Sequence, residues 1–209
     1  MSAIAVLDYG MGNLRSVEKA LERVGASPTI TSDHATAREA RGLILPGVGA
    51  FPAAITRVRD LGLDELVEER LRAGVPVLGI CLGLQLLFES SPEHGGAAGL
   101  GLLEGEVREL RTGGLKLPHI GWSALRWERS SRLGEGIEDR TPFYFVHSFA
   151  PEPLPEDVLG TTEHGERFAC AVERGTLFGV QFHPEKSSEA GLRLLANFDR
   201  ICAAAAVHA

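Results

Sequence analysis

The chain has 209 residues, long enough to bury one substantial core, and its 44% hydrophobic and 23% charged residues are ordinary for a globular protein. Its net charge of −7, with the basic residues scattered, argues against nucleic-acid binding, which needs clustered Lys and Arg. No apolar run approaches a membrane span, the N-terminus has no targeting signal, and three cysteines cannot all pair. We therefore expect a cytoplasmic protein whose cysteines are free for chemistry.

In the first part of the chain, buried strands alternate with amphipathic helices. Three apolar runs are predicted as strands, at residues 3–7, 42–45 and 75–80. Helical patterns follow them, at residues 14–24, 64–73 and 82–90. Asn13 is in position to cap the first helix, and Gly25 is in position to end it.

The second part of the chain is richer in strands. Residues 92–100 are predicted as a loop, and short strands with some antiparallel pairing are expected from about residue 104 to 182. The last helix is predicted to start near Ser188. These elements predict an α/β fold with an open, doubly wound, mostly parallel central sheet, helices on both faces and additional antiparallel strands. No repeat or linker divides the chain, so a single domain over residues 1–209 is expected.

A candidate nucleophile lies in Gly79-Ile80-Cys81-Leu82-Gly83, which is the cysteine form of the G-x-S-x-G nucleophile elbow. The glycines let strand and helix approach closely around a strained turn. We expect this turn to expose the sulfur at a helix N-terminus, with the N–H of Leu82 directed toward a forming oxyanion. Taken alone, the pattern fits a buried structural cysteine equally well. Cys170 and Cys202 are expected to pack in the core.

A candidate base and its orienting carboxylate occur together in His183-Pro184-Glu185, after a predicted strand. Pro184 is expected to keep the chain extended, so that His183 and Glu185 project to the same side and form a relay. A strand-end histidine beside a solvated glutamate is the alternative. His119 and His147 lie on or beside strands and are candidates for burial, but neither has a carboxylate placed in this way.

A third segment, Pro46-Gly47-Val48-Gly49, also follows a predicted buried strand. Its two glycines would let backbone N–H groups approach a ligand and complete an oxyanion hole. Because the carboxyl ends of parallel strands gather at one edge of a sheet, this turn, Cys81 and His183 can meet there.

These three segments, in this order, resemble the class I (triad) glutamine amidotransferases, whose glutaminase domain carries an oxyanion turn, a G-x-C-x-G elbow and a terminal H-P-E. The resemblance covers essentially the whole chain. It implies hydrolysis of glutamine to glutamate and ammonia through a γ-glutamyl thioester, without a cofactor or metal. The implied roles are Cys81, His183 and Glu185 as the catalytic triad, Val48 and Leu82 as oxyanion donors, and Gly49, Gln85, Ser148 and Phe149 as glutamine contacts.

Within that family, four segments resemble the glutaminase subunits of imidazole glycerol phosphate synthases of histidine biosynthesis: residues 9–14, 46–49, 117–122 and 144–148. This resemblance implies a heterodimer with a separate (β/α)₈-barrel cyclase, which uses the ammonia to make imidazole glycerol phosphate and an aminoimidazole carboxamide ribonucleotide. Residues at or near that interface would be Asn13, Trp122, Tyr144 and Lys186. Judged by residue type alone, these would be a helix cap, two core aromatics and a solvated charge.

Four other functions remain to be weighed. A dinucleotide-binding module is disfavoured because Arg15 stands where the third glycine of G-x-G-x-x-G would be. Gln85 argues against a free-standing cysteine hydrolase, and the intact triad argues against an inactive regulatory subunit. A glutaminase subunit of another synthase, serving anthranilate or pyridoxal phosphate synthesis, would share the triad but lack the segments at 9–14 and 117–122.

Overall fold

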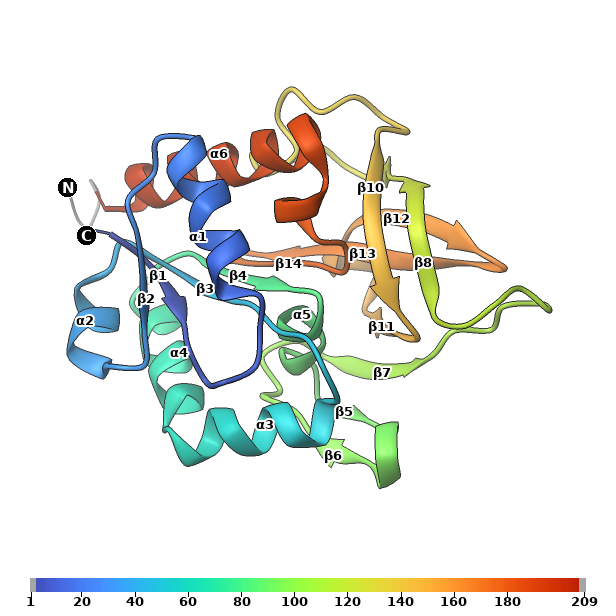
Figure 1. Cartoon of the computed structure of the whole chain (residues 1–209), viewed down its shortest axis with the longest axis horizontal. Helices are drawn as coiled ribbons and strands as arrows, with labels where there is room; N and C mark the ends of the chain where they lie inside the picture. Colours follow the sequence, from blue (N-terminus) through green and yellow to red (C-terminus); the bar gives the residue numbers. More distant parts are fainter. Residues whose placement is uncertain (1–2, 207–209) are drawn as a thin grey trace.

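The computed structural model describes residues 3–206, and an eight-stranded sheet lies at its centre (Figure 1). Five neighbouring strands run parallel, in the order β2 (Pro28–Thr31), β1 (Ile4–Leu7), β3 (Gly42–Leu45), β4 (Val77–Ile80) and β14 (Leu177–Val180). Three antiparallel strands continue the sheet, in the order β13 (Glu166–Arg174), β12 (Val158–His164) and β9 (Arg126–Trp127). The predicted α/β fold with a mixed sheet is confirmed.

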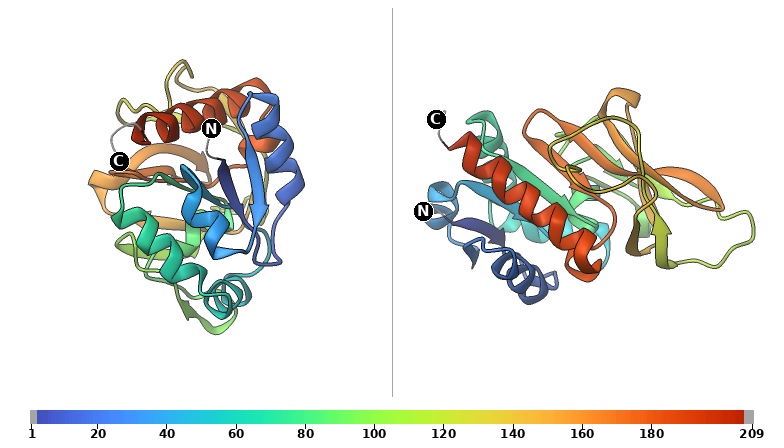
Figure 2. Two further views of the ribbon diagram at one scale, coloured as in Figure 1. Left: turned by 90° about the vertical axis from the view of Figure 1, so that its left-hand side faces the viewer. Right: turned by 90° about the horizontal axis from the view of Figure 1, so that it is seen from above.

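Helices cover both faces of the parallel strands (Figures 1 and 2). One face carries α1 (Leu14–Arg23) and α6 (Ser188–Ala205), and the other carries α2 (His34–Glu39), α3 (Phe51–Asp60), α4 (Leu63–Arg72) and the short α5 (Leu82–Leu86). Alternate residues of β1 enter the two cores, with Val6 in the α1–α6 core and Leu7 in the other. Burial on both faces explains why the parallel strands are continuous apolar runs. No helix in the described part of the chain is both long and apolar enough to cross a membrane.

Of the two smaller sheets, one lies at the end of the molecule beside the antiparallel strands, and the other extends from there to α3 (Figure 1). One pairs β8 (His119–Ala124) with β10 (Pro142–His147), and the other has the order β11 (Phe149–Pro153), β7 (Gly105–Glu109), β5 (Ser90–Ser91) and β6 (Ala97–Ala98). Three 3₁₀ turns complete the described structure: η1 (Glu93–Gly95), η2 (Pro155–Asp157) and η3 (Pro184–Lys186). Strand β8 turns His119 inward, whereas Ile120 and Trp122 are exposed.

The structure corrects two expected elements. The helix after Cys81 ends at Leu86 rather than at residue 90, because the carbonyls of Leu86 and Leu87 accept hydrogen bonds from the amides of residues 100, 102 and 103. The segment at 92–100, expected as a loop, contains η1 and β6. In addition, β2, α2 and α3 were not predicted.

Candidate active site

Cys81 lies between β4 and α5, in a strained backbone turn. Its φ is 54° and its ψ is −109°, a left-handed conformation that costs energy for any residue with a Cβ. Its N–H donates to the Val180 carbonyl at 2.8 Å, which joins the turn to β14. A Cβ on Gly79 would lie 2.8 Å from the backbone nitrogen of Leu84, and one on Gly83 would overlap a backbone carbonyl oxygen. The close approach that the glycine spacing predicts is therefore present.

The sulfur, however, is less accessible than expected. Cys81 is only 6% exposed, and the side-chain amide of Gln181 donates to its Sγ at 3.6 Å. Gln181 comes directly after β14, the neighbour of β4 in the sheet, so its side chain covers the end of β4. The prediction of an exposed sulfur is wrong for this reason.

His183 and Glu185 form the predicted pair. The imidazole Nδ1 lies 2.9 Å from Glu185 Oε1, and both side chains are 2% exposed. The backbone between them was expected to be extended, but it forms the 3₁₀ turn η3, with Pro184 as its first residue. This turn is held by Ser187, whose Oγ donates to the His183 carbonyl at 2.7 Å. Proline suits the first position of such a turn as well as it suits an extended segment.

The environment of His183 favours its protonated form. Burial lowers the pKa of the imidazole, but the interactions with Cys81 and Glu185 outweigh burial and raise the pKa to about 10. Nδ1 is bound to Glu185, whereas Nε2 is buried and makes no hydrogen bond within the described residues. The protonated imidazole is therefore favoured, and Nε2 is the nitrogen available to Cys81 and a substrate.

The turn at residues 46–49 packs directly against the elbow. A Cβ on Gly47 would lie 3.0 Å from the Cβ of Leu82. The turn is pinned at its start by Tyr9, a fully buried residue whose hydroxyl donates to the Pro46 carbonyl at 2.6 Å. Burial is the main cause, and the nearby Cys81 a lesser one, that raises the pKa of Tyr9. The hydroxyl therefore keeps its proton and remains a donor. Val48 is 40% exposed, at the outer edge of the turn.

Two of the candidate glutamine contacts meet beside the nucleophile. The Gln85 side-chain amide donates to the Phe149 carbonyl at 2.9 Å and to Gln181 Oε1 at 3.1 Å. The Ser148 carbonyl already accepts a hydrogen bond from the amide of Leu110. Sequence reasoning assigned no role to Tyr9 or Gln181, because their importance depends on hydrogen bonds between elements far apart in the chain.

The four candidate interface residues lie at the surface or partly buried near it. Trp122 is 52% exposed, so it is not a core aromatic. Its ring centroid lies 6.0 Å from that of Tyr144, and Lys186 Nζ lies 5.9 Å from the Tyr144 ring. Asn13 occupies the N-cap position of α1, but its side chain makes no capping hydrogen bond, and its carbonyl instead accepts from the amides of residues 16 and 17.

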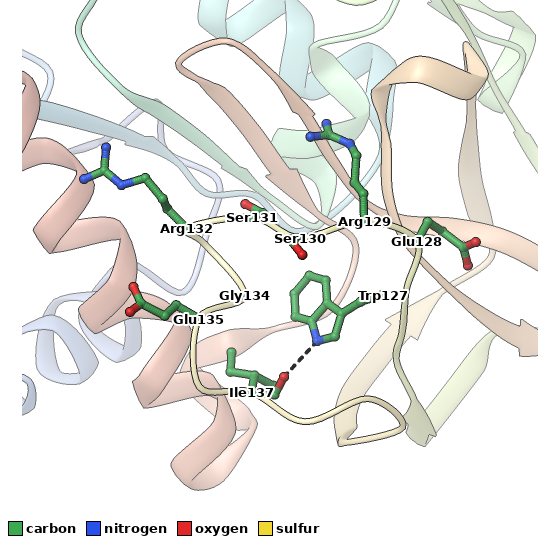
Figure 3. Close-up of a pocket in the computed structure, with 9 residues that line it drawn as sticks. All are labelled: Trp127, Glu128, Arg129, Ser130, Ser131, Arg132, Gly134, Glu135 and Ile137. Atoms are coloured by element: carbon green, nitrogen blue, oxygen red, sulfur yellow. Dashed lines mark hydrogen bonds between the residues drawn. The ribbon is translucent and has the colours of Figure 1, made fainter.

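A large hollow lies elsewhere, along the segment from Trp127 to Ile137 (Figure 3). Its volume is about 920 Å³, and the Trp127 indole donates to the Ile137 carbonyl at 3.1 Å within it. No member of the triad lines this hollow. Size alone therefore does not locate the chemistry, and within residues 3–206 no group of three or more His, Cys, Asp or Glu could hold a metal ion.

The family model for class I glutamine amidotransferase matches residues 5–201. This chain belongs to the class I glutamine amidotransferases. Among its relatives in that class is the imidazole glycerol phosphate synthase subunit HisH of Moorella thermoacetica, 52% identical over 96% of each chain. The HisH subunit of Aquifex aeolicus is 50% identical and covers 93% of this amidotransferase and 95% of its own chain.

Solved structures show the same fold at low identity. The crystal structure of a glutamine amidotransferase matches this chain with a TM-score of 0.75 and 22% identity, over 96% of this chain and 99% of that one. PurLQS from Thermotoga maritima matches with a TM-score of 0.74 and 20% identity, over 95% and 98%. These likenesses concern the fold, whereas the HisH sequences indicate the branch of the family.

Proposed function

We propose that this amidotransferase is the glutaminase subunit of an imidazole glycerol phosphate synthase and acts in the cytoplasm in histidine biosynthesis. It hydrolyses glutamine and passes the ammonia to a separate (β/α)₈-barrel cyclase. The observation that carries the proposal is about 50% identity to HisH subunits over nearly the full length of both chains. The whole chain serves as one glutaminase domain, with Cys81, His183 and Glu185 as its triad.

In the first half of the reaction, His183 holds the proton taken from the Cys81 thiol, and the resulting thiolate attacks the side-chain carbonyl carbon of glutamine. The carbonyl electrons move to oxygen, and the N–H groups of Leu82 and Val48 stabilise the resulting oxyanion. When the intermediate collapses, the C–N bond breaks and His183 gives its proton to the departing nitrogen. The products are ammonia and a γ-glutamyl thioester on Cys81. The raised pKa of His183 suits this step, because the proton is already on the imidazole.

In the second half, His183 is neutral and accepts a proton from water, which attacks the thioester carbonyl. The C–S bond breaks, glutamate leaves, and the proton is back on His183. Glu185 stays ionised throughout and holds Nδ1 at 2.9 Å, so that Nε2 remains directed at the reacting atoms. Gly49, Gln85, Ser148 and Phe149 hold the glutamine substrate.

The cyclase docks over Asn13, Trp122, Tyr144 and Lys186. Support comes from the exposure of Trp122 and Ile120, because large apolar side chains seldom lie together on the surface without a partner. Lys186 lies only three residues after His183 in the chain, so this surface is close to the point where ammonia forms.

The proposal is tested by measuring glutamate release from glutamine, with the chain alone and with a histidine-pathway cyclase plus its ribonucleotide ligand. We expect turnover that rises with the cyclase, disappears in Cys81→Ala and persists in Cys170→Ala, the matched control at a buried cysteine outside the triad. Cys81-dependent turnover that ignores this cyclase would assign the chain to another synthase. Absence of turnover in every mixture would reject the glutaminase.

A further inference from the structure

We propose that His119 and His147 are positioning residues for glutamine binding. By donating to the carbonyl of Phe149 they hold in place the acceptor that orients the Gln85 side chain toward the substrate. The inference rests on the proposed glutaminase activity and concerns how its substrate pocket is held. Neither histidine belongs to the triad, and both are buried in the strand-rich end of the molecule.

The two histidines form a continuous hydrogen-bonded chain. His147 Nδ1 lies 2.8 Å from the Phe149 carbonyl oxygen, and His147 Nε2 lies 3.1 Å from His119 Nδ1. At the far end, His119 Nε2 lies 2.9 Å from Ser123 Oγ. The chain therefore runs from β8, through β10, to the first residue of β11.

Each proton in this chain has only one possible place. The Phe149 carbonyl can only accept, so His147 Nδ1 must carry the hydrogen. Burial, supplemented by neighbouring histidine charges, lowers the pKa of His147 to about 3 and that of His119 to about 4, so both rings are neutral at pH 7. His147 Nε2 is then an acceptor, His119 Nδ1 its donor, and Ser123 Oγ the donor to His119 Nε2. All the donors point toward Phe149, and such aligned bonds strengthen one another.

The Phe149 carbonyl also accepts a hydrogen bond from Gln85, which joins the histidine chain to that side chain. Gln85 Nε2 has two hydrogens, and both are used, one on Phe149 and one on Gln181 Oε1. The amide oxygen of Gln85 is therefore the end left for a ligand. An oxygen that only accepts selects the N–H donors of glutamine, its ammonium group or its side-chain amide. Gln181 in turn donates to the Cys81 sulfur, so the same network reaches the nucleophile.

Packing alone would explain the burial of these rings but not their polarity. His119 stacks on Phe145 with centroids 5.0 Å apart and on His164 at 4.2 Å. Phenylalanine would fill the same space without leaving a buried ring nitrogen in need of a partner. What phenylalanine cannot do is donate to the Phe149 carbonyl. A purely structural role and a positioning role therefore predict different outcomes for a histidine-to-phenylalanine substitution.

The test compares kcat and KM for glutamine in the full complex with the cyclase. His147→Phe removes the donor that holds the Phe149 carbonyl in place, so the carbonyl and the Gln85 amide bound to it can shift. KM should therefore rise by about five- to thirtyfold, more than kcat falls. His147→Asn restores a donor at the position of Nδ1 and should recover most of that loss. His164→Phe, which changes a stacked ring outside the chain, should leave KM unchanged.

A KM for His147→Phe equal to that of the unmodified complex, or one that His147→Asn does not improve, would overturn the inference. If His147→Phe does not fold, His119→Phe tests the same chain one step further from Phe149, with a smaller expected rise in KM. Cys81-dependent turnover by the unmodified complex is measured alongside. Its absence would reject the proposed function, whereas its presence with unchanged KM in the variants would reject only the positioning role.

Discussion

The strained backbone of Cys81 makes the stability of variants at this position depend on whether the replacement residue has a Cβ. The residue has φ 54° and ψ −109°, a region that glycine enters without steric cost. We predict that Cys81→Gly is more stable than Cys81→Ala, although neither variant can hydrolyse glutamine. Both variants lack the sulfur, so their comparison isolates the effect of the Cβ.

The size of the difference follows from two opposing contributions. A residue with a Cβ in such a conformation costs about 1–3 kcal/mol, which glycine removes. Glycine also destabilises the fold by about 0.5–1 kcal/mol, because it increases the conformational entropy of the unfolded chain. The net gain is about 0–2.5 kcal/mol. For a chain of this length, 1 kcal/mol shifts the melting temperature by about 2–4 °C, so the glycine variant should melt up to about 10 °C above the alanine variant.

Thermal unfolding followed by circular dichroism measures this difference, with Cys170 as the matched control. Cys170 is fully buried in β13 and is not among the described residues with positive φ. There, glycine should be less stable than alanine by about 0.5–1 kcal/mol, so the sign of the difference reverses between the two cysteines. If glycine is also the less stable replacement at position 81, the elbow is not strained and the reasoning fails.

Three further predictions concern the elbow, the surface and pH. Gly83→Ala should lower the free energy of unfolding, measured by urea titration, by about 3 kcal/mol. The control Gly101→Ala should lower it by only about 1 kcal/mol, because a Cβ at Gly101 meets open space. Equal losses in the two variants would contradict the close packing at Gly83. Trp122→Ala should weaken cyclase binding by about ten- to a hundredfold in calorimetry without changing the melting temperature, and unchanged affinity would place the interface elsewhere. Because its pKa is raised, His183 stabilises the fold below pH 6.5 and loses this contribution as pH rises through about 10. His147 has a lowered pKa, so its contribution to the free energy of unfolding is present above pH 6.5 and is lost as pH falls toward about 3. The melting temperature of His147→Phe should therefore fall less steeply over this acidic range than that of the unmodified protein.

The sequence was sufficient to predict the sheet, the elbow and the pairing of His183 with Glu185, because each depends on local patterns and on the common direction of parallel strands. It was less informative where tertiary contacts override local preference. The helix after Cys81 stops early because amides of residues 100–103 donate hydrogen bonds to the carbonyls of residues 86–88. No local sequence pattern indicates these hydrogen bonds. By contrast, α3 carries a helical spacing of buried residues that could have been found, at Phe51, Ala54, Ile55 and Val58.

The surroundings of the sulfur were beyond prediction for a related reason. Gln181 reaches Cys81 across the boundary between β4 and β14, and His147 acts through a carbonyl two residues further along the chain. Side-chain hydrogen bonds of this kind leave no periodic pattern. Only the order of the strands, which the sequence does not state, shows which polar residues become neighbours.

The placement of β4 beside β14 also determines when the active site can form during synthesis of the chain. Cys81 is translated early, whereas the neighbouring strand β14 and His183, the proposed base, emerge from the ribosome only near the end of synthesis. A chain that stops before residue 183 contains the thiol and the elbow but has no imidazole to protonate a leaving nitrogen. With His183 in its proposed role, unfinished chains cannot hydrolyse glutamine, and ammonia production begins only after nearly the whole polypeptide has been made and folded.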